Sequence, residues 1–386
     1  MKRNGIALIF YHHVKNRFIK IYTFVVLYHH KQIKKQTMKN RNFTLDLLRV
    51  MACYLVIHQH ASEFFYIGEN GTVVTGDNTF RIGIMTSIAR ISVPLFVMIS
   101  GYLLLPMKTT THDFLKKRFT RILYPFITWC ALYAIYYVFT KDETWLQALT
   151  HIINIPVNFG VEVGHLWYIY MLIGLYLLVP ILSPWLNSCS KREIQGYLLL
   201  WGATTLIPYI HIVFPQILGE CFWNPTPAFY YFNGFVGYMI LGYYIKRYGS
   251  LGLVTSLAIA VSGYAVTAYI FCSRINTASI IPELELSWGF CTANIALLAW
   301  GTFSLFTHIR WKGNNIAGKI ISDISQKSYG MYLAHIMLLN LYYGIFSPYF
   351  ENTLVSVPLI SICTFISVYL TIKVLSYIPS SKYWLG

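Results

Sequence analysis

The sequence predicts an all-α membrane protein: a polytopic helical bundle of about ten transmembrane helices with both termini in the cytoplasm. Of the 386 residues, 56% are hydrophobic and 11% are charged, whereas a soluble domain carries about 25% charged residues. Apolar runs of membrane-spanning length recur along the chain, and they are continuous rather than alternating, which disfavours a β-barrel. The net charge of +16 gathers in alternate loops, which is typical of membrane proteins, so we expect a lipid bilayer and no nucleic acid as partner.

The first 40 residues are predicted to be a basic extension that precedes the membrane domain, residues 41–386. Their apolar patches are too short to span a bilayer, and they lack the long apolar core and cleavage site of a signal peptide. Met38 stands just before the first predicted span. We hypothesise that Met38 is the native start and that residues 1–37 are upstream sequence or a disordered basic arm. The histidine pairs of this extension lack partner ligands and the seven cysteines of the chain have no metal spacing, so no metal site is predicted.

Ten apolar segments are predicted to be helices, with boundaries good to a few residues. They lie near residues 44–66, 80–105, 121–140, 166–183, 195–214, 228–246, 251–272, 286–308, 329–347 and 354–378. Basic residues concentrate before the first segment and after the second, fourth, sixth and eighth, which indicates that both termini are cytoplasmic. The chain shows no convincing internal repeat, so it lacks the usual signature of an inverted-repeat transporter.

The first predicted helix contains ionisable groups, which are costly in lipid and usually face a cavity or a partner. At about 100° per residue, Arg49 and His60 fall within about 20° of each other around the axis, separated by about 16 Å of rise. Asp46 lies about 40° from His60, whereas His58 points to the opposite side. Asp46, Arg49 and His60 therefore form one polar stripe. The alternative is a helix end with snorkelling charges and one hydrogen-bonded histidine.

Arginines in and after the second predicted helix are candidate binding residues. Arg90 is an intramembrane cation, expected to face a cavity, a counter-ion or an anionic ligand. Beyond it, Ser100-Gly101 allows close approach of another backbone. Arg118 and Arg121 are helical neighbours whose guanidinium forks match phosphate geometry, so they are candidates to hold a phosphorylated ligand. The alternative for this pair is anchoring to anionic lipid.

Aromatic residues and histidines open the fourth and ninth predicted helices. Trp167 is typical of an interfacial anchor, and His165 beside it either contacts a sugar or is solvated. His335 shares one side of the ninth helix with Tyr329 and Tyr332, and its alternative is a hydrogen-bonded core histidine. The sequence shows no phosphate-binding glycine loop, zinc-protease signature, nucleophile elbow or dinucleotide fingerprint.

Together these segments resemble the acyltransferase 3 family of multi-pass membrane acyltransferases, most closely its surface-polysaccharide O-acetyltransferase branch. An Asp-x-x-Arg element followed by ten residues and a histidine matches Asp46, Arg49 and His60. The later matches are, in chain order, Arg90, Pro94, Leu95, Phe96, Ser100, Gly101, Tyr102, Arg118, Arg121, Pro125, Leu166, Trp167, Tyr168, Tyr332, Leu333 and His335. The first 40 residues have no counterpart, the extra His58 complicates the assignment, and the family's frequent esterase-like domain has no match here.

The resemblance implies transfer of an acyl group, usually acetyl from acetyl-CoA, to a hydroxyl of a cell-envelope polysaccharide or lipid-linked glycan at the bacterial inner membrane. Within it we assign His60 as general base or transient acyl acceptor, because a histidine titrates near neutral pH. Arg49 and Asp46 would orient the stripe or bind the donor. The residues expected to bind the CoA donor are Arg118, Arg121 and Arg90, and those expected near the acceptor are Trp167, His165 and His335.

Two other classes of protein remain open at this stage. A transporter or flippase for a lipid-linked sugar would also have intramembrane arginines and a cavity, but it would not require an in-phase Asp-Arg-His stripe. A membrane receptor or assembly factor without chemistry would tolerate the loss of His60. The route of the acyl group is open as well: either the donor reaches His60 directly or the acyl group is relayed.

Overall fold

The computed structural model describes residues 42–156, 164–216, 220–221, 224–227, 234–311, 313 and 315–386. The chain divides into two compact units, Met1–Phe43 and Thr44–Gly386, and only the second is considered below. The predicted basic extension and the Met38 start lie outside the described residues.

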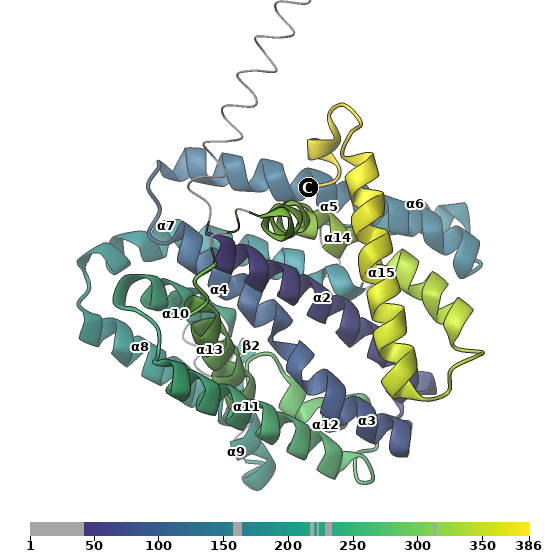
Figure 1. Cartoon of the computed structure of the whole chain (residues 1–386), viewed down its shortest axis with the longest axis horizontal. Coiled ribbons are helices and arrows are strands. Elements are labelled where there is room, and N and C mark those ends of the chain that lie inside the picture. Colours follow the sequence, from purple (N-terminus) through teal and green to yellow (C-terminus); the bar gives the residue numbers. More distant parts are fainter. Residues whose placement is uncertain are drawn as a thin grey trace, which may run out of the picture. The chain divides into compact units, whose positions relative to one another are not determined.

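The unit is built from helices, as the apolar runs predict (Figure 1). Its helices are α2 (Phe43–Tyr66), α3 (Asp77–Thr86), α4 (Ser92–Leu104), α5 (Thr111–Thr140), α6 (Trp145–Asn154), α7 (Trp167–Ser188), α8 (Lys191–Thr204), α9 (Ile207–Val213), α10 (Phe235–Tyr248), α11 (Leu253–Arg274), α12 (Ile281–Leu284), α13 (Ala293–Thr307), α14 (Ile316–Phe346) and α15 (Thr353–Leu375). Short 3₁₀ segments join several of them, including η2 (Ser87–Ile91), η3 (Gly164–Leu166) and η5 (Glu285–Trp288). Strands β1 (Glu220–Cys221) and β2 (Asn224–Pro227) form a small antiparallel pair.

Seven helical segments of the described chain are long and apolar enough to cross a membrane, which makes this a multi-pass membrane protein. They are Asp77–Leu104, Thr111–Thr140, Gly164–Ser188, Lys191–Val213, Leu253–Arg274, Ile281–Thr307 and Thr353–Leu375. The predicted count of about ten is therefore not confirmed. Helix α10 has only 14 residues, whereas α2 and α14 are long but carry the ionisable groups of the predicted site, which lower their hydropathy.

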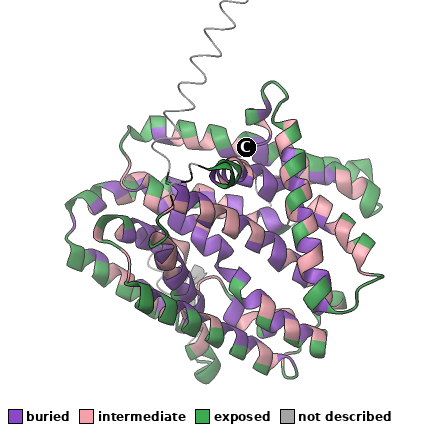
Figure 2. Ribbon diagram, in the orientation of Figure 1, coloured by how far each residue is buried: buried purple, intermediate pink, exposed green. Residues whose placement is uncertain are grey.

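Helices α2 and α4 lie in the interior of the unit (Figure 2). The largest hydrophobic cluster draws buried residues from α2, α4, α5, α7, α10, α13, α14 and α15. Polar residues of α2 are thus held inside the protein rather than at its lipid-facing surface. This burial is what permits ionisable side chains in a membrane helix.

Glycines bring α4 and α10 into backbone contact. A Cβ at Gly101 would lie 1.9 Å from the carbonyl oxygen of Met239, and one at Gly242 would lie 2.1 Å from that of Met98. Only glycine fits at these two positions, and small residues are the usual way for membrane helices to approach closely. The predicted close approach at Ser100-Gly101 is confirmed.

Candidate functional site

The predicted polar stripe of α2 faces α14. The Ser325 hydroxyl donates to the Asp46 carboxylate at 2.7 Å, and the Arg49 guanidinium donates to the same hydroxyl oxygen at 3.4 Å. Farther along both helices, the ring centroids of His60 and His335 lie 5.4 Å apart. Because α2 is a regular helix, Asp46, Arg49 and His60 lie on one face of it, and that face contacts α14 at both ends of the stripe.

His58 lies on the other side of α2, as its helical phase predicts. Its Nδ1 is 3.2 Å from the hydroxyl oxygen of Ser361 on α15, and its ring stacks on Tyr54. The structure therefore separates the two histidines of the His-Gln-His segment. Only His60 belongs to the site.

A cavity of about 420 Å³ opens beside the arginine end of the stripe. We call it the arginine cavity, because Arg49, Arg118 and Arg121 line it and no carboxylate of the described residues does. Its other lining residues are Phe96, Ser100, Leu103, Leu104, Ile122, Tyr168, Leu172, Tyr176, Ser325, Gln326, Ser328, Tyr329 and Tyr332. The buried Nε of Arg118 has no hydrogen-bond partner in the described part of the chain. Three guanidinium groups line this cavity, and one of them has an N–H without a hydrogen-bond partner among the described residues. Such a set is suited to bind the phosphate oxygens of a phosphorylated ligand.

Three histidines converge at the other end of the stripe, from α2, η3 and α14. The ring centroids of His60 and His165 are 6.4 Å apart, and those of His165 and His335 are 5.1 Å apart. The Nδ1 of His335 lies 2.6 Å from the carbonyl oxygen of Tyr332, so Nδ1 carries the proton and the neutral ring leaves Nε2 as an acceptor. The Nε2 atoms of His165 and His335 are buried without a hydrogen-bond partner among the described residues. Ring nitrogens without a partner can form hydrogen bonds with a ligand hydroxyl.

Glu63 is a residue of the site that the sequence analysis missed. Its Oε2 lies 2.8 Å from the Nδ1 of His60, one helical turn away. A carboxylate at Nδ1 fixes the imidazole orientation and leaves Nε2 to act as a base. The structure records no partner for the Nε2 of His60 among the described residues. The signal was available, because an acidic residue three positions after a helical histidine is its neighbour on the helix surface.

Tyr332 joins the arginine cavity to the histidine cluster. Its side chain lines the cavity, its hydroxyl donates to the carbonyl oxygen of His165, and its ring centroid is 5.9 Å from that of His335. Tyr168 also lines the cavity and lies 5.5 Å from Tyr332, centroid to centroid. Tyr332 is therefore a lining residue of the cavity that also contacts the histidine cluster, whereas His60 does not line the cavity.

Arg90 lies apart from Arg118 and Arg121. Its Nη2 is 2.9 Å from Glu285 and 3.2 Å from the Tyr66 hydroxyl, which donates to the same carboxylate. Its Cζ stands 4.2 Å from the ring centroid of Trp288. Of the alternatives weighed for Arg90, the structure shows the counter-ion, and it does not bring this residue to the arginine cavity.

The residues expected on the acceptor side are only partly brought together. His165 is 9% exposed, so the alternative that it is solvated is wrong. Trp167 is half-buried and packs against Phe235 and Phe290, with ring centroids 5.9 and 5.6 Å away. Trp167 follows His165 by two residues, but it is not part of the histidine cluster.

The described residues contain no group of three or more His, Cys, Asp or Glu side chains arranged to hold a metal ion. What the histidine cluster does show is one imidazole, His60, with a carboxylate partner in Glu63. A half-buried imidazole with a carboxylate partner is suited to act as a general base.

Apolar spans that enclose an arginine cavity and a carboxylate-paired histidine define the class: a multi-pass membrane protein with an internal site suited to acid–base chemistry. The family model described as an acyltransferase domain, that of the acyltransferase 3 family, matches residues 42–373. This chain belongs to the acyltransferase 3 family. Searches of curated proteins and of solved structures gave no match.

Proposed function

We propose that this membrane acyltransferase moves an acetyl group from acetyl-CoA to a hydroxyl of a cell-envelope polysaccharide or lipid-linked glycan. The protein would reside in the bacterial inner membrane with both termini in the cytoplasm, as the charge of its loops indicates. Family membership supports acyl transfer. The observation that carries the rest is the continuous path of side chains from the arginine cavity through Tyr332 to the His60–Glu63 pair.

The donor would bind in the arginine cavity. CoA carries phosphates, and guanidinium groups bind phosphate oxygens through paired, charge-assisted hydrogen bonds. Arg118 and Arg121 come from the start of α5, within the basic segment that precedes the third predicted span. Arg49 lies deeper, beside Ser325 and Asp46. For Arg90, the pairing with Glu285 favours the counter-ion role over donor binding.

His60 would act as the general base. Its Nε2 takes the proton of the acceptor hydroxyl while that oxygen attacks the thioester carbonyl, and Glu63 stabilises the resulting imidazolium. When the tetrahedral intermediate collapses, the C–S bond breaks and the imidazolium returns its proton to the leaving thiolate. If His60 is instead a transient acyl acceptor, the same Nε2 first attacks the thioester, the C–S bond breaks and CoA leaves as the thiolate, so that an acyl-imidazole forms. The acceptor hydroxyl then attacks this acyl group, the N–C bond breaks to release the imidazole, and the hydroxyl proton goes to the CoA thiolate. Rapid quenching with acetyl-CoA alone separates the two, since only the second leaves acyl label on the protein.

The acceptor would enter from the side of His165, His335 and Trp167. The unpaired Nε2 atoms of the two histidines are available to accept hydrogen bonds from sugar hydroxyls. Since His60 does not line the arginine cavity and Tyr332 contacts both the cavity and His335, we expect Tyr332 to move when the thioester reaches His60.

Mass spectrometry of envelope glycans tests the proposal. Cells that carry the protein should show an acetylated glycan that is lost in its absence and with His60→Ala. His58→Ala is the matched control, since His58 is equally a histidine of α2 but contacts Ser361 on the opposite side. Glycans unchanged by deletion, or sugar flux without acetyl-CoA turnover, would instead support the transporter. Equal loss with both variants would contradict the role of His60.

A further inference from the structure

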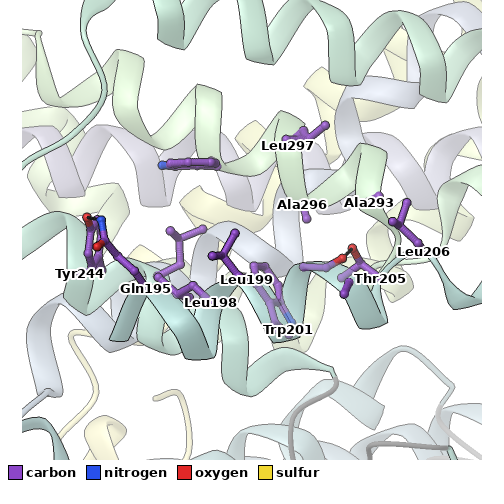
Figure 3. Close-up of a pocket in the computed structure, with 14 residues that line it drawn as sticks. Gln195, Leu198, Leu199, Trp201, Thr205, Leu206, Tyr244, Ala293, Ala296 and Leu297 are labelled. Carbon is purple, nitrogen blue, oxygen red and sulfur yellow. Dashed lines mark hydrogen bonds between the residues drawn. The ribbon is translucent and has the colours of Figure 1, made fainter. Parts of the chain in front are cut away.

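A second cavity, of about 680 Å³, is an apolar groove between α8, α10 and α13 (Figure 3). We call it the α8 groove. Gln195 and Tyr244 lie together at one end, and Thr205 and Leu206 lie at the other, with Ala296 and Leu297 of α13 facing α8 across the gap. Gln195 to Leu206 corresponds to about 16 Å of helical rise. None of the residues assigned to acyl transfer lines this groove.

The α8 groove faces the hydrocarbon of the bilayer. It lies on the candidate span Lys191–Val213, of which only 17% is buried inside the protein. Leu199, which lines the groove, is 75% exposed. Among the described residues, and apart from the adjacent backbone of its own helix, no heavy atom lies within 4 Å of a Cβ placed at Gly202, so there is room at this position for an added side chain. Within a membrane, an apolar space of this kind is occupied by hydrocarbon, because water is excluded there.

Two basic side chains lie near the end of the α8 groove that contains Gln195. The Nζ of Lys191 is 5.5 Å and the Cζ of Arg247 is 5.3 Å from the ring centroid of Tyr248, and that ring is 5.1 Å from Tyr244, which lines the groove. Glu193 lies in the same turn of α8, but its carboxylate accepts the backbone N–H of Ser190. Two cations therefore stand one aromatic ring away from the polar end of an apolar groove.

We propose that the α8 groove binds one hydrocarbon chain of an anionic phospholipid from the cytoplasmic leaflet, with its phosphate at Lys191 and Arg247. The length of the groove, about 16 Å along α8, matches one acyl chain, because one leaflet supplies about half of a hydrocarbon core of about 30 Å. The charge fits as well, since basic residues beside the cytoplasmic surface attract anionic lipids. A second copy of the chain fits less well, because a two-fold contact through this groove would bring the same cations together. The inference rests on the proposed membrane orientation and not on acyl transfer.

Native mass spectrometry of the delipidated full-length protein in detergent tests the site. Phosphatidylglycerol and phosphatidylcholine with the same acyl chains are the two probes, and we expect one tightly bound phosphatidylglycerol. Gly202→Leu fills the groove and should weaken that binding at least about tenfold, because displacing two buried methylene groups is enough. Gly174→Leu is the matched control: Gly174 lies in α7, is exposed, and likewise has no heavy atom of the described residues, beyond its own adjacent helix backbone, within 4 Å of an added Cβ.

The headgroup is tested separately. Lys191→Gln should reduce the preference for phosphatidylglycerol over phosphatidylcholine about fivefold, the usual effect of one basic residue near the membrane surface. Lys319→Gln, at an exposed lysine in the first turn of α14, should leave the preference unchanged.

Three results would overturn the proposal. The first is equal binding of both lipids by the wild type, and the second is equal binding by the Gly202→Leu and Gly174→Leu variants. The third is a dimer, seen in the same spectra, that Gly202→Leu dissociates, since the groove would then belong to a second copy. Acetyl transfer is measured independently, so failure of the lipid site leaves the proposed function standing.

Discussion

Replacing Glu63 by Gln tests whether the carboxylate beside His60 takes part in catalysis. The variant keeps the shape of the side chain but removes its charge, 2.8 Å from the Nδ1 of His60. A hydrogen bond to a charged group contributes about 1.5–3 kcal/mol, against about 0.5–1.5 kcal/mol for a neutral one. The difference of about 1–2 kcal/mol applies to the imidazolium that forms in the transition state. It corresponds to a kcat lower by roughly 5- to 30-fold.

The assay is acetyl-CoA consumption and glycan acetylation by the purified protein, followed by liquid chromatography and mass spectrometry. The KM for acetyl-CoA should change less than twofold, because Glu63 does not line the arginine cavity. Glu63→Asp keeps the charge and should recover part of the lost kcat. A positioning residue moves kcat in this way, whereas a general loss of structure would not be rescued by charge.

The chain offers a matched control in a second histidine–glutamate pair. Glu143 Oε2 lies 2.9 Å from His151 Nε2, between α5 and α6. Glu143→Gln removes the same kind of bond outside the candidate site and should leave kcat unchanged. An unaltered kcat for Glu63→Gln, or an effect confined to KM, would refute the reasoning about His60.

Three further predictions concern donor binding and packing. Arg121→Gln removes one guanidinium from the arginine cavity and should raise the KM for acetyl-CoA about tenfold or more, with kcat at saturation within about twofold. An unchanged KM in steady-state kinetics would contradict binding of the donor in this cavity. Gly101→Ala places a Cβ 1.9 Å from a backbone oxygen and should destabilise the protein by about 1–3 kcal/mol in thermal unfolding, whereas Gly174→Ala, in open space, should be neutral or slightly stabilising. Arg90→Leu leaves the Glu285 carboxylate without its counter-ion and should lower the free energy of unfolding by about 2 kcal/mol in thermal unfolding. The double variant with Glu285→Leu should recover part of that stability. A raised KM for acetyl-CoA in Arg90→Leu would instead indicate that Arg90 binds the donor.

Helical periodicity predicted much of the site, because Asp46, Arg49 and His60 all lie on one regular helix, α2. The phase of α2 selected Arg49 and His60 and rejected His58, and their contacts with α14 and α15 confirm this division. Glu63 was within reach of the same reasoning, since it lies one turn beyond His60.

Contacts between segments that are far apart in the chain could not be predicted from the sequence. Arg90 and Glu285 are 195 positions apart, and nothing in either segment specifies the other as its partner. The predicted count of about ten spans is likewise not confirmed: seven segments of the described residues qualify by length and apolar composition, and ionisable groups lower the hydropathy of helices such as α2. The burial of His165 depends on rings from α5 and α14, which a local pattern does not reveal.

The glycine contacts between α4 and α10 give the protein a rigid partition. On one side of it, Phe96 and Ser100 of α4 border the space assigned to the thioester donor; on the other, Leu241 and Tyr244 of α10 border the space assigned to lipid. The two backbones are in contact at Gly101 and Gly242, with no side chain between them at these positions, so we expect binding in one cavity to have little effect on the other. We therefore expect the affinity for acetyl-CoA to be about the same in membranes of different lipid composition, since the two sites would have a coupling free energy near zero.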